Sequence, residues 1–308
     1  MIVVAGEALI DLLVHSDGRL VPVAGGGPYN TARAIARLGV PSRWLGGLSS
    51  DRFGRMLEAG LVADGVGLDL VQRTDHPTTL ALAELDGHGS ATYRFYTEGT
   101  SAPAVLAGPL AAGLPTGVRA VHVGTLGLVL EPMATTLESL ASSLPDDVIL
   151  AVDPNCRPSI TPDPAAYRAR IARVLARADV VKASVEDLAF LFPGASARDA
   201  ATRVMGLGAR VVIVTDGGRP VTVHVGGGTH EVPVPAVRVA DTVGAGDTFG
   251  GAFLALLVHE GRARRDLAGP SVAVRAAGFA VRASAMVCER EGADPPTLAD
   301  LGGWPSLS

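Results

Sequence analysis

The sequence predicts an α/β protein in which a mostly parallel sheet is covered on both faces by helices. Short apolar runs of strand length alternate along the chain with segments of helical spacing, a pattern typical of such sheets. Hydrophobic residues make up 48% of the 308 residues but aromatic residues only 4%. The core must therefore be built from Ala, Val and Leu, which buried parallel strands use readily. We expect one domain spanning residues 1–308.

The expected elements follow one another in a regular order. The predicted strands are residues 2–9, 43–48, 120–123, 148–152, 180–182 and 211–215, followed by a hairpin of residues 221–225 and 231–234 around three glycines. The predicted helices are residues 30–38, 52–63, 132–143, 165–178, 197–207 and 252–258. An extended apolar stretch, residues 232–239, precedes the last of these. In such sheets the ligand lies beyond the carboxyl ends of the strands.

Residues 78–96 interrupt this alternation. Two β-rich runs flank Asp86-Gly87-His88-Gly89, and no helix follows, which predicts a β-hairpin. Together with a short pair of strands around Ser16-Asp17-Gly18, it predicts a flap built from residues of about 12–24 and 70–100. The alternative is an edge hairpin of the main sheet. A flap would exclude water from a reacting group.

Charge and composition exclude several classes of partner. The net charge is −5, and the basic residues are scattered or lie along one helix face, so no nucleic-acid or membrane-surface patch is expected. The N-terminus has no basic region, and no run of about 18 apolar residues is evident. We therefore expect a cytoplasmic protein. The two cysteines, Cys156 and Cys288, lack metal-ligand spacing and are expected to be reduced thiols.

Residues 241–249, Asp-Thr-Val-Gly-Ala-Gly-Asp-Thr-Phe, carry the strongest functional signal. Small residues at Gly244, Ala245 and Gly246 let the backbone approach an anion at the start of a helix. Asp247 would repel that anion unless it has a task of its own, such as taking a proton from an attacking hydroxyl. The alternative is a glycine-rich helix start with Asp247 as an ordinary cap.

This run resembles the C-terminal signature of the PfkB (ribokinase-like) carbohydrate kinases. The resemblance implies a three-layer ribokinase-like sandwich with a small β-sheet lid. It also implies that Gly244, Ala245 and Gly246 form an oxyanion hole and that Asp247 is the catalytic base. Other phosphate loops fail on spacing, because no Gly-x-x-x-x-Gly-Lys-Ser/Thr occurs and the glycines do not fit a dinucleotide fingerprint.

A second glycine-rich segment, residues 25–32, precedes the first predicted helix. It resembles the first signature of the same family, which implies that Gly26, Gly27 and Asn30 hold the sugar. Asp11 matches the family aspartate that accepts hydrogen bonds from sugar hydroxyls. Without the resemblance, the segment could be only a tight strand-to-helix turn and Asp11 a capping residue.

The identity of the acceptor depends on two further segments. Residues 153–157, Asp-Pro-Asn-Cys-Arg, resemble runs in fructokinase-like and 2-keto-3-deoxygluconate-kinase-like members, and Arg157 could orient the ligand or tie down its loop. On residues 93–96, Tyr93 and Phe95 lie on one strand face, and Arg94 and Tyr96 on the other. Inward Arg94 and Arg157 would suit a carboxylate, whereas an inward aromatic pair would suit a sugar or a base. Arg94, Tyr96 and Arg157 are our candidate sugar contacts.

Nucleotide contacts are expected along the later strands. The 26 basic residues include a single lysine, Lys182, and the run from Lys182 resembles the family's Lys-x-Asn-x-x-Glu region, with Ser184 in place of Asn. Either Glu186 or Asp187 would help to position Mg²⁺. The remaining candidates, also by resemblance, are Thr215 and Gly217 beside the nucleotide and Gly292 at the adenine.

Taken together, these features predict an ATP-dependent sugar kinase that phosphorylates a primary hydroxyl, with fructose as the first candidate acceptor. The alternatives are a 2-keto-3-deoxygluconate kinase, a ribokinase, a nucleoside kinase and, from another class, a non-catalytic sugar-binding protein. The expected cofactors are ATP and Mg²⁺, with a monovalent cation such as K⁺ as a further candidate. By the same resemblance we expect a homodimer formed through the lid.

Overall fold

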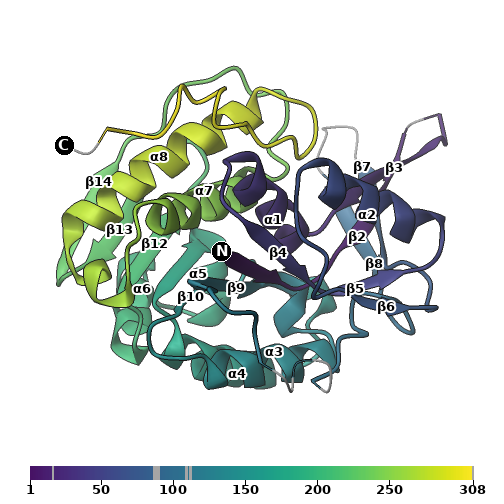
Figure 1. Cartoon of the computed structure of the whole chain (residues 1–308), viewed down its shortest axis with the longest axis horizontal. Helices are drawn as coiled ribbons and strands as arrows, with labels where there is room; N and C mark the ends of the chain where they lie inside the picture. Colours follow the sequence, from purple (N-terminus) through teal and green to yellow (C-terminus); the bar gives the residue numbers. More distant parts are fainter. Residues whose placement is uncertain (16, 86–90, 108–109, 111–112, 307–308) are drawn as a thin grey trace.

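An eight-stranded sheet forms the centre of the computed structural model, which describes residues 1–15, 17–85, 91–107, 110 and 113–306 (Figure 1). The strand order is β14-β13-β12-β11-β10-β9-β1-β4, parallel except for β13, which runs antiparallel to both of its neighbours. The strands are β1 (Ile2–Ala5), β4 (Ser42–Leu45), β9 (Ala120–Gly124), β10 (Ile149–Asp153), β11 (Val180–Ser184), β12 (Val211–Thr215), β13 (Val221–Val225) and β14 (Gly228–Val232).

Helices cover both faces of this sheet, which confirms the predicted α/β class (Figure 1). Alternate strand residues supply two apolar cores, as in β1, where Ile2 and Val4 face one core and Val3 and Ala5 the other. The first core is completed by α1 (Gly27–Arg37), α2 (Arg52–Ala63), α7 (Ala245–His259) and α8 (Pro270–Cys288). The second is completed by α3 (Met133–Ser143), α4 (Pro164–Arg177), α5 (Val185–Leu191) and α6 (Ala197–Leu207). Short 3₁₀ turns are η2 (Thr125–Leu128), η3 (Pro158–Ile160) and η4 (Arg264–Ala268).

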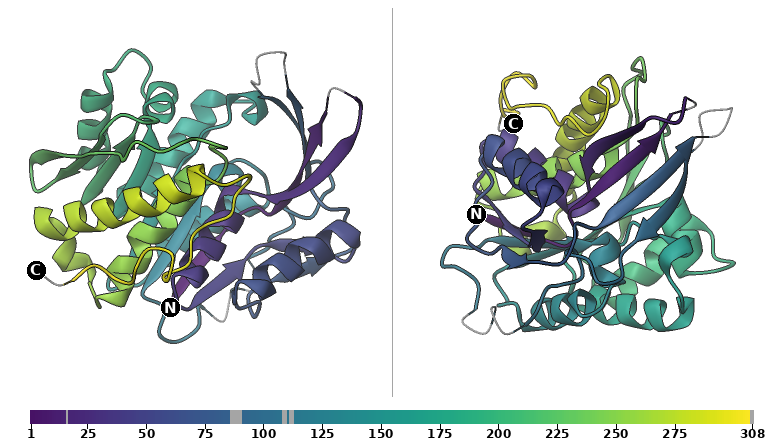
Figure 2. Two further views of the ribbon diagram at one scale, coloured as in Figure 1. Left: turned by 90° about the horizontal axis from the view of Figure 1, so that it is seen from above. Right: turned by 90° about the vertical axis from the view of Figure 1, so that its right-hand side faces the viewer.

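A separate four-stranded sheet forms the lid and stands away from the main sheet (Figure 2). Its order is β3-β2-β7-β8, with β2 and β7 parallel in the middle and antiparallel pairs outside them. The strands are β2 (Leu9–Val14), β3 (Leu20–Gly25), β7 (Leu80–Leu85) and β8 (Ala91–Tyr96). The flap is thus present and is not an edge hairpin of the main sheet. The expected turn at 86–89 and Ser16 lie outside the described residues.

Two predicted strands are each divided in the structure. Residues 2–9 contain β1 and then the start of β2, because the chain leaves the main sheet for the lid at Gly6, whose φ is +152°. Residues 43–48 contain β4 and β5 (Gly47–Ser49), and β5 pairs with β6 (Gln72–Thr74) in a sheet of its own. Buried apolar residues lie on both sides of each break, so the hydrophobic pattern carries no sign of it.

The region before the glycine-rich turn also differs from expectation. Residues 233–239 form no strand, since Pro233 and Pro235 cannot donate to a ladder. Helix α7 begins at Ala245, earlier than the predicted residue 252. Glycines lower intrinsic helix propensity, but here they allow close packing: a Cβ on Gly251 would lie 3.0 Å from the Cβ of Ala34 on α1. Tertiary packing therefore decides where this helix starts.

Helix α8 is long and apolar enough to cross a membrane by length and composition alone, which the sequence analysis did not anticipate. Half of its apolar window is buried inside the protein. It lies along α7 and also packs on β13 and β14 (Figure 1). Its apolar side chains therefore pack into the core that α8 forms with α7 and the sheet.

Candidate active site

A cavity of about 430 Å³ opens at the carboxyl ends of the parallel strands, beneath the lid. Both glycine-rich segments, the Asp-Pro-Asn-Cys-Arg run and the lid contribute to its wall. The lining residues are Glu7, Leu9, Asp11, Gly26, Gly27, Asn30, Tyr93, Phe95, Thr125, Leu126, Asn155, Arg157, Lys182, Thr242, Val243, Gly244, Gly246 and Asp247. The tertiary structure thus brings together segments that are more than 200 residues apart in the chain, as the 217-residue separation of Asn30 and Asp247 illustrates.

The start of α1 brings backbone into this wall. Gly26 has a φ of +110°, and a Cβ there would lie 2.6 Å from the carbonyl oxygen of Glu7, so only glycine fits. A Cβ on Gly27 would lie 3.2 Å from Oδ1 of Asp247. One turn along the helix, Asn30 donates from Nδ2 to Oδ2 of Asp247 at 2.9 Å. Its Oδ1 is buried without a partner among the described residues, and so is available to a ligand hydroxyl.

The turn of residues 242–247, termed the catalytic turn after the role that the sequence predicts for it, begins α7. Gly244 is the N-cap residue and has the left-handed φ of +76°. Ala245, Gly246 and Asp247 form the first helical turn, where backbone N–H groups lack intrahelical partners and the helix dipole favours an anion. Among the described residues, the N–H of Ala245 is bonded to the carbonyl of Thr242 at 3.2 Å. The N–H groups of Gly246 and Asp247, in the first turn of α7, have no acceptor in the part of the chain that the structure describes.

Asp247 has the protonation behaviour of a general base. Burial raises its pKa to about 6, and the nearby Asp153 carboxylate acts in the same direction. The hydrogen bond from Asn30 and the charges of Lys182 and Arg157 oppose this rise. A carboxylate with a pKa of about 6 is ionised at neutral pH yet holds a proton more strongly than an ordinary aspartate.

Lys182, the only lysine, lies directly beneath the catalytic turn. Its Nζ is paired with Oδ2 of Asp153 at 2.7 Å, and both residues are buried. A Cβ on Gly246 would lie 3.1 Å from Nζ. Burial alone would lower the pKa of Lys182, but the Asp153 carboxylate raises it above its usual value, with smaller contributions from Asp187 and Asp247. Lys182 therefore presents a permanent positive charge to the turn.

The lid closes the opposite side of the cavity. Asp11 on β2 is partly buried, which raises its pKa to about 6, an effect that Arg157 opposes. On β8, Tyr93 and Phe95 face the cavity, with stacked rings 6.1 Å apart. Arg94 and Tyr96 do not line it.

The sugar contacts predicted for Arg94 and Tyr96 are therefore corrected. Strand alternation turns these two side chains away from the cavity, and 51% of Tyr96 is exposed on the other face of the lid. The inward pair is aromatic, which suits the apolar face of a sugar.

Arg157 ties down its own loop and also lies in the cavity wall. One guanidinium nitrogen, Nη1, donates to the carbonyl oxygen of Asn155 at 3.0 Å, to its Oδ1 at 2.7 Å and to the carbonyl of Cys156 at 3.1 Å. These bonds fix a loop in which Asn155 has an unusual φ of +37°. The rest of the guanidinium lines the cavity.

A second cavity of about 440 Å³ adjoins the first and shares Thr242 and Gly246 with it. Its walls are mainly apolar and come from β12, β13, α8 and the segment before the catalytic turn. The lining residues are Thr215, Gly217, Gly218, Val221, Val234, Pro235, Ala236, Val237, Val239, Thr242, Ala245, Gly246, Phe249, Val281, Ser284, Ala285 and Cys288. The two cavities therefore meet at the catalytic turn.

Two predicted nucleotide contacts, Ser184 and Gly292, line neither cavity. The hydroxyl of Ser184 caps α5 by accepting the N–H of Asp187 at 3.0 Å. Gly292 donates its N–H to Asp241 at 2.9 Å and supports the catalytic turn from behind. Thr215 and Gly217, in contrast, line the cavity as expected.

The structure also distinguishes the two acidic candidates for a metal. Asp187 is buried, and its oxygens accept the N–H groups of Cys156 at 2.6 Å and Ser184 at 2.8 Å. Glu186 is exposed at the start of α5 and takes part in no hydrogen bond among the described residues. In that same part of the chain no three His, Cys, Asp or Glu side chains converge on a metal site. Glu186 thus fits an ion held mainly by phosphate and water.

Glu7 is a site residue that the sequence analysis did not select. It is almost fully buried at the floor of the first cavity, which raises its pKa to about 8. Its two oxygens accept the N–H groups of Gly27 at 3.3 Å and Gly127 at 3.1 Å. The sequence did offer a signal for Glu7, since an acidic residue that follows an apolar strand is expected at the carboxyl edge of the sheet, where the ligand lies.

Comparisons with known proteins agree with this geometry. A sequence model of the pfkB family carbohydrate kinases matches residues 1–300. The chain is 35% identical over 261 residues to a fructokinase of Rhizobium leguminosarum bv. trifolii, covering 83% of this chain and 79% of that one.

Solved structures show the same architecture. Fructokinase with bound ATP from Xylella fastidiosa is 28% identical with a TM-score of 0.89, over 97% of this chain and 96% of that one. Fructokinase from Vibrio cholerae O395 in its fructose, ADP and calcium ion bound form is 25% identical with a TM-score of 0.86, over 98% and 97%. The predicted ribokinase-like fold is confirmed.

Proposed function

Because the chain belongs to the PfkB family of carbohydrate kinases, we propose that it transfers the γ-phosphate of ATP to a primary hydroxyl of fructose. It is a phosphotransferase with an alcohol acceptor, similar to fructokinases. The observation that carries the proposal is the meeting of two cavities at the catalytic turn, with Asp247 on the side of the first. One cavity would hold the sugar and the other the nucleotide.

The sugar would be held by groups that face the first cavity. The unpartnered Oδ1 of Asn30 and the carboxylate of Asp11 are acceptors for hydroxyl groups, and Tyr93 and Phe95 offer an apolar face. In this pose a primary hydroxyl lies beside Asp247. Asp247 then takes the hydroxyl proton as the oxygen attacks the phosphoryl group in line.

Charge on the transferring group would be stabilised by the catalytic turn. The N–H groups of Gly246 and Asp247 and the positive end of α7 face the point where the two cavities join. The ammonium of Lys182 beneath the turn adds a positive charge in a buried setting. These donors are fixed before the reaction begins, so little reorganisation is needed.

Mg²⁺ is the proposed metal, and it would neutralise charge on the nucleotide phosphates. Glu186 is the residue we propose to hold its water shell, because the Asp187 carboxylate is already used by two backbone N–H groups. A monovalent cation such as K⁺ is retained as a proposed activator. Replacing K⁺ by Na⁺ in the assay tests that part alone.

The acceptor is tested by coupling ATP consumption to a panel of fructose, ribose, 2-keto-3-deoxygluconate and adenosine. We expect the highest kcat/KM with fructose. Because Arg157 lines the cavity, 2-keto-3-deoxygluconate is the second candidate, and a preference for it would replace fructose in the proposal. No ATP consumption with any acceptor, together with fructose-dependent thermal stabilisation, would indicate a non-catalytic binding protein.

Two parts of the proposal concern the whole molecule, namely a cytoplasmic location and a homodimer formed through the lid. The two edge strands of the lid each expose an apolar side chain, Leu20 on β3 at 55% and Tyr96 on β8 at 51%, which would be available to a second copy of the chain. Light scattering of the wild type and of Leu20→Ser tests the dimer. A wild-type mass equal to one chain would contradict it.

A further inference from the structure

The rear side of the catalytic turn rests on the segment that follows α8. A Cβ added at Gly244 would lie 2.7 Å from the Cβ of Ala293 and 3.1 Å from its Cα, so the two backbones are in close contact. Beside this contact, one oxygen of Asp241 accepts the N–H of Gly292 at 2.9 Å, and the other accepts that of Val243 at 3.0 Å. The position of the turn therefore depends on where Gly292 and Ala293 lie.

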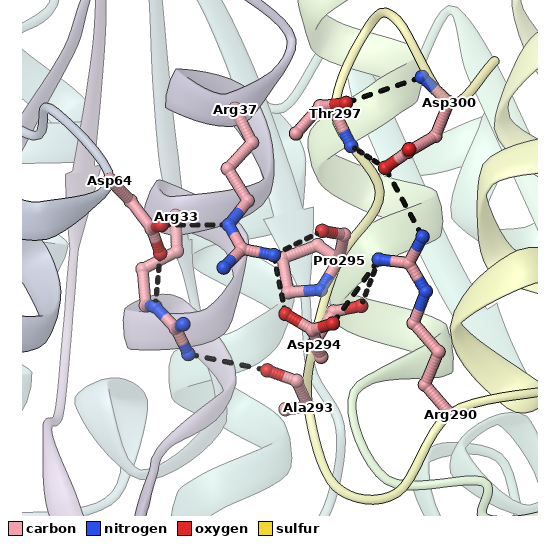
Figure 3. A network of polar contacts seen from close by, with 9 residues as sticks. All are labelled: Arg33, Arg37, Asp64, Arg290, Ala293, Asp294, Pro295, Thr297 and Asp300. Carbon is pink, nitrogen blue, oxygen red and sulfur yellow. Dashed lines mark hydrogen bonds and ion pairs between the residues drawn. The ribbon is translucent and has the colours of Figure 1, made fainter.

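Side chains from α1 hold this segment in place (Figure 3). Residues 290–300 form neither helix nor strand, so no backbone ladder fixes them. Arg33 donates from Nη1 to the carbonyl oxygen of Ala293 at 3.2 Å. Arg37 donates from Nη1 to the carbonyl oxygen of Pro295 at 2.6 Å. Two guanidinium groups on one helix thus donate hydrogen bonds to nearby carbonyl oxygens of the segment.

A single carboxylate keeps the two arginines together (Figure 3). Asp64, at the end of α2, accepts from Nε of Arg33 on one oxygen at 2.6 Å and from Nε of Arg37 on the other at 2.7 Å. The Asp64 side chain is only 9% exposed, and those of the arginines 15% and 22%. Arg33 and Arg37 are four residues apart on one helix face, so without Asp64 their like charges would repel.

The same helix also carries a contact to the proposed base. Asn30 lies about one turn before Arg33 on α1 and donates to Asp247 at 2.9 Å. One rigid element thus contacts Asp247 on the cavity side and, through Ala293, the back of Gly244. Both contacts must be in place for the catalytic turn and the Asp247 carboxylate to keep their relative positions.

We propose that Arg33, Asp64 and Arg37, termed the α1 clamp, position the catalytic turn for phosphoryl transfer. None of the three lines either cavity. They act through Ala293 on Gly244, so they are positioning residues. The inference rests on the proposed function, because it assigns the clamp to the transfer step. The loss of a clamp contact displaces the turn by a small distance, which reactions that depend on orientation tolerate poorly.

The test compares Arg33→Met, which keeps the apolar stem but removes the donors, with Arg33→Lys, which keeps the charge. Arg170→Met is the matched control. The Arg170 side chain is 19% exposed and pairs with Glu138 at 3.1 Å and with Glu131, yet lies on α4 and lines neither of the two cavities. Three quantities are measured: kcat and KM for fructose, the thermal midpoint, and amide hydrogen exchange of residues 241–247 and 289–296.

For Arg33→Met we expect kcat to fall roughly tenfold, while KM for fructose stays within about twofold. Amide exchange should accelerate in both measured segments, and Arg33→Lys should recover part of the lost kcat. Arg170→Met should lower the thermal midpoint to a similar degree without changing kcat or the exchange of either segment. A kcat for Arg33→Met equal to that of the control, or faster exchange confined to residues 289–296, would overturn the proposal.

Failure of this inference and failure of the proposed function are distinguishable. If the wild type fails to consume ATP with every acceptor in the panel, the kinase assignment fails. Hydrogen exchange still reports in that case whether the clamp holds the turn. If the wild type is active and Arg33→Met is unchanged in kcat and exchange, only the clamp fails.

Discussion

Replacing Asp247 by Asn removes the proposed base, and the structure dictates how the new amide would sit. Asn30 donates from Nδ2 to Oδ2 of Asp247 at 2.9 Å. In Asp247→Asn the new side chain must therefore turn its carbonyl oxygen toward Asn30. Its NH₂ group then faces the cavity, where an NH₂ group can donate a hydrogen bond but cannot accept a proton. Shape is conserved and only the chemistry changes.

The expected loss in kcat is on the order of 10²–10⁴-fold, the usual contribution of a general base. KM for sugar and nucleotide should change little. The free energy of unfolding, in contrast, should increase in this variant. Burial raises the pKa of Asp247 from 3.8 to about 6, so the ionised carboxylate destabilises the folded wild type. A shift of that size corresponds to between about 1 and 3 kcal/mol. Asp247→Asn should therefore be more stable than the wild type above pH 6, an advantage that disappears as the pH falls below 4.

Coupled ATP consumption and denaturant unfolding at two pH values measure both effects. Asp163→Asn is the matched control: Asp163 caps α4 by accepting the N–H groups of Ala165 at 2.9 Å and Ala166 at 3.0 Å, a task that Asn performs equally well. The control should behave as the wild type. Near-normal turnover of Asp247→Asn with normal nucleotide affinity would refute the assignment of the base.

Three further predictions follow from the same geometry. Below pH 6 the wild-type kcat/KM should fall about tenfold per pH unit as Asp247 gains its proton, and a flat profile down to pH 5 would contradict the pKa argument. Lys182→Met should cost roughly 3–5 kcal/mol in denaturant unfolding because it leaves the Asp153 carboxylate buried and unpaired, and the added change Asp153→Leu should restore most of the loss. Should the single variant lose less than about 1 kcal/mol, the pair is not structurally important. Tyr93→Ala should raise KM for fructose about tenfold while Tyr96→Ala leaves it unchanged, and the opposite result would mean that the other face of β8 contacts the sugar.

Much of the candidate site follows from short-range signals in the sequence. The run from Gly244 to Asp247 encodes a helix start by its small residues, and the structure has one there. The glycines at 26 and 27 encode close backbone approach, which the short distances to Glu7 and Asp247 bear out. Such signals are readable because they depend on the conformations that a few neighbouring residues allow.

Contacts between distant segments could not be read in this way. The sequence left both faces of β8 open, and only the seating of the lid over the strand ends turned Tyr93 inward and Arg94 outward. It marked Lys182 as unusual but did not reveal its partner Asp153, which lies on the neighbouring strand.

The sequence by itself therefore determined the α/β class, the order of the elements, the flap and the helix start at the glycine-rich turn that begins α7, because periodicity and backbone freedom are local properties. Tertiary structure alone decided which face of the lid meets the cavity and which acid pairs with Lys182. It also decided that Ala293, held by a hydrogen bond from Arg33, supports Gly244. Those outcomes depend on how layers pack against one another, and packing joins residues whose separation in the chain carries no periodic signal.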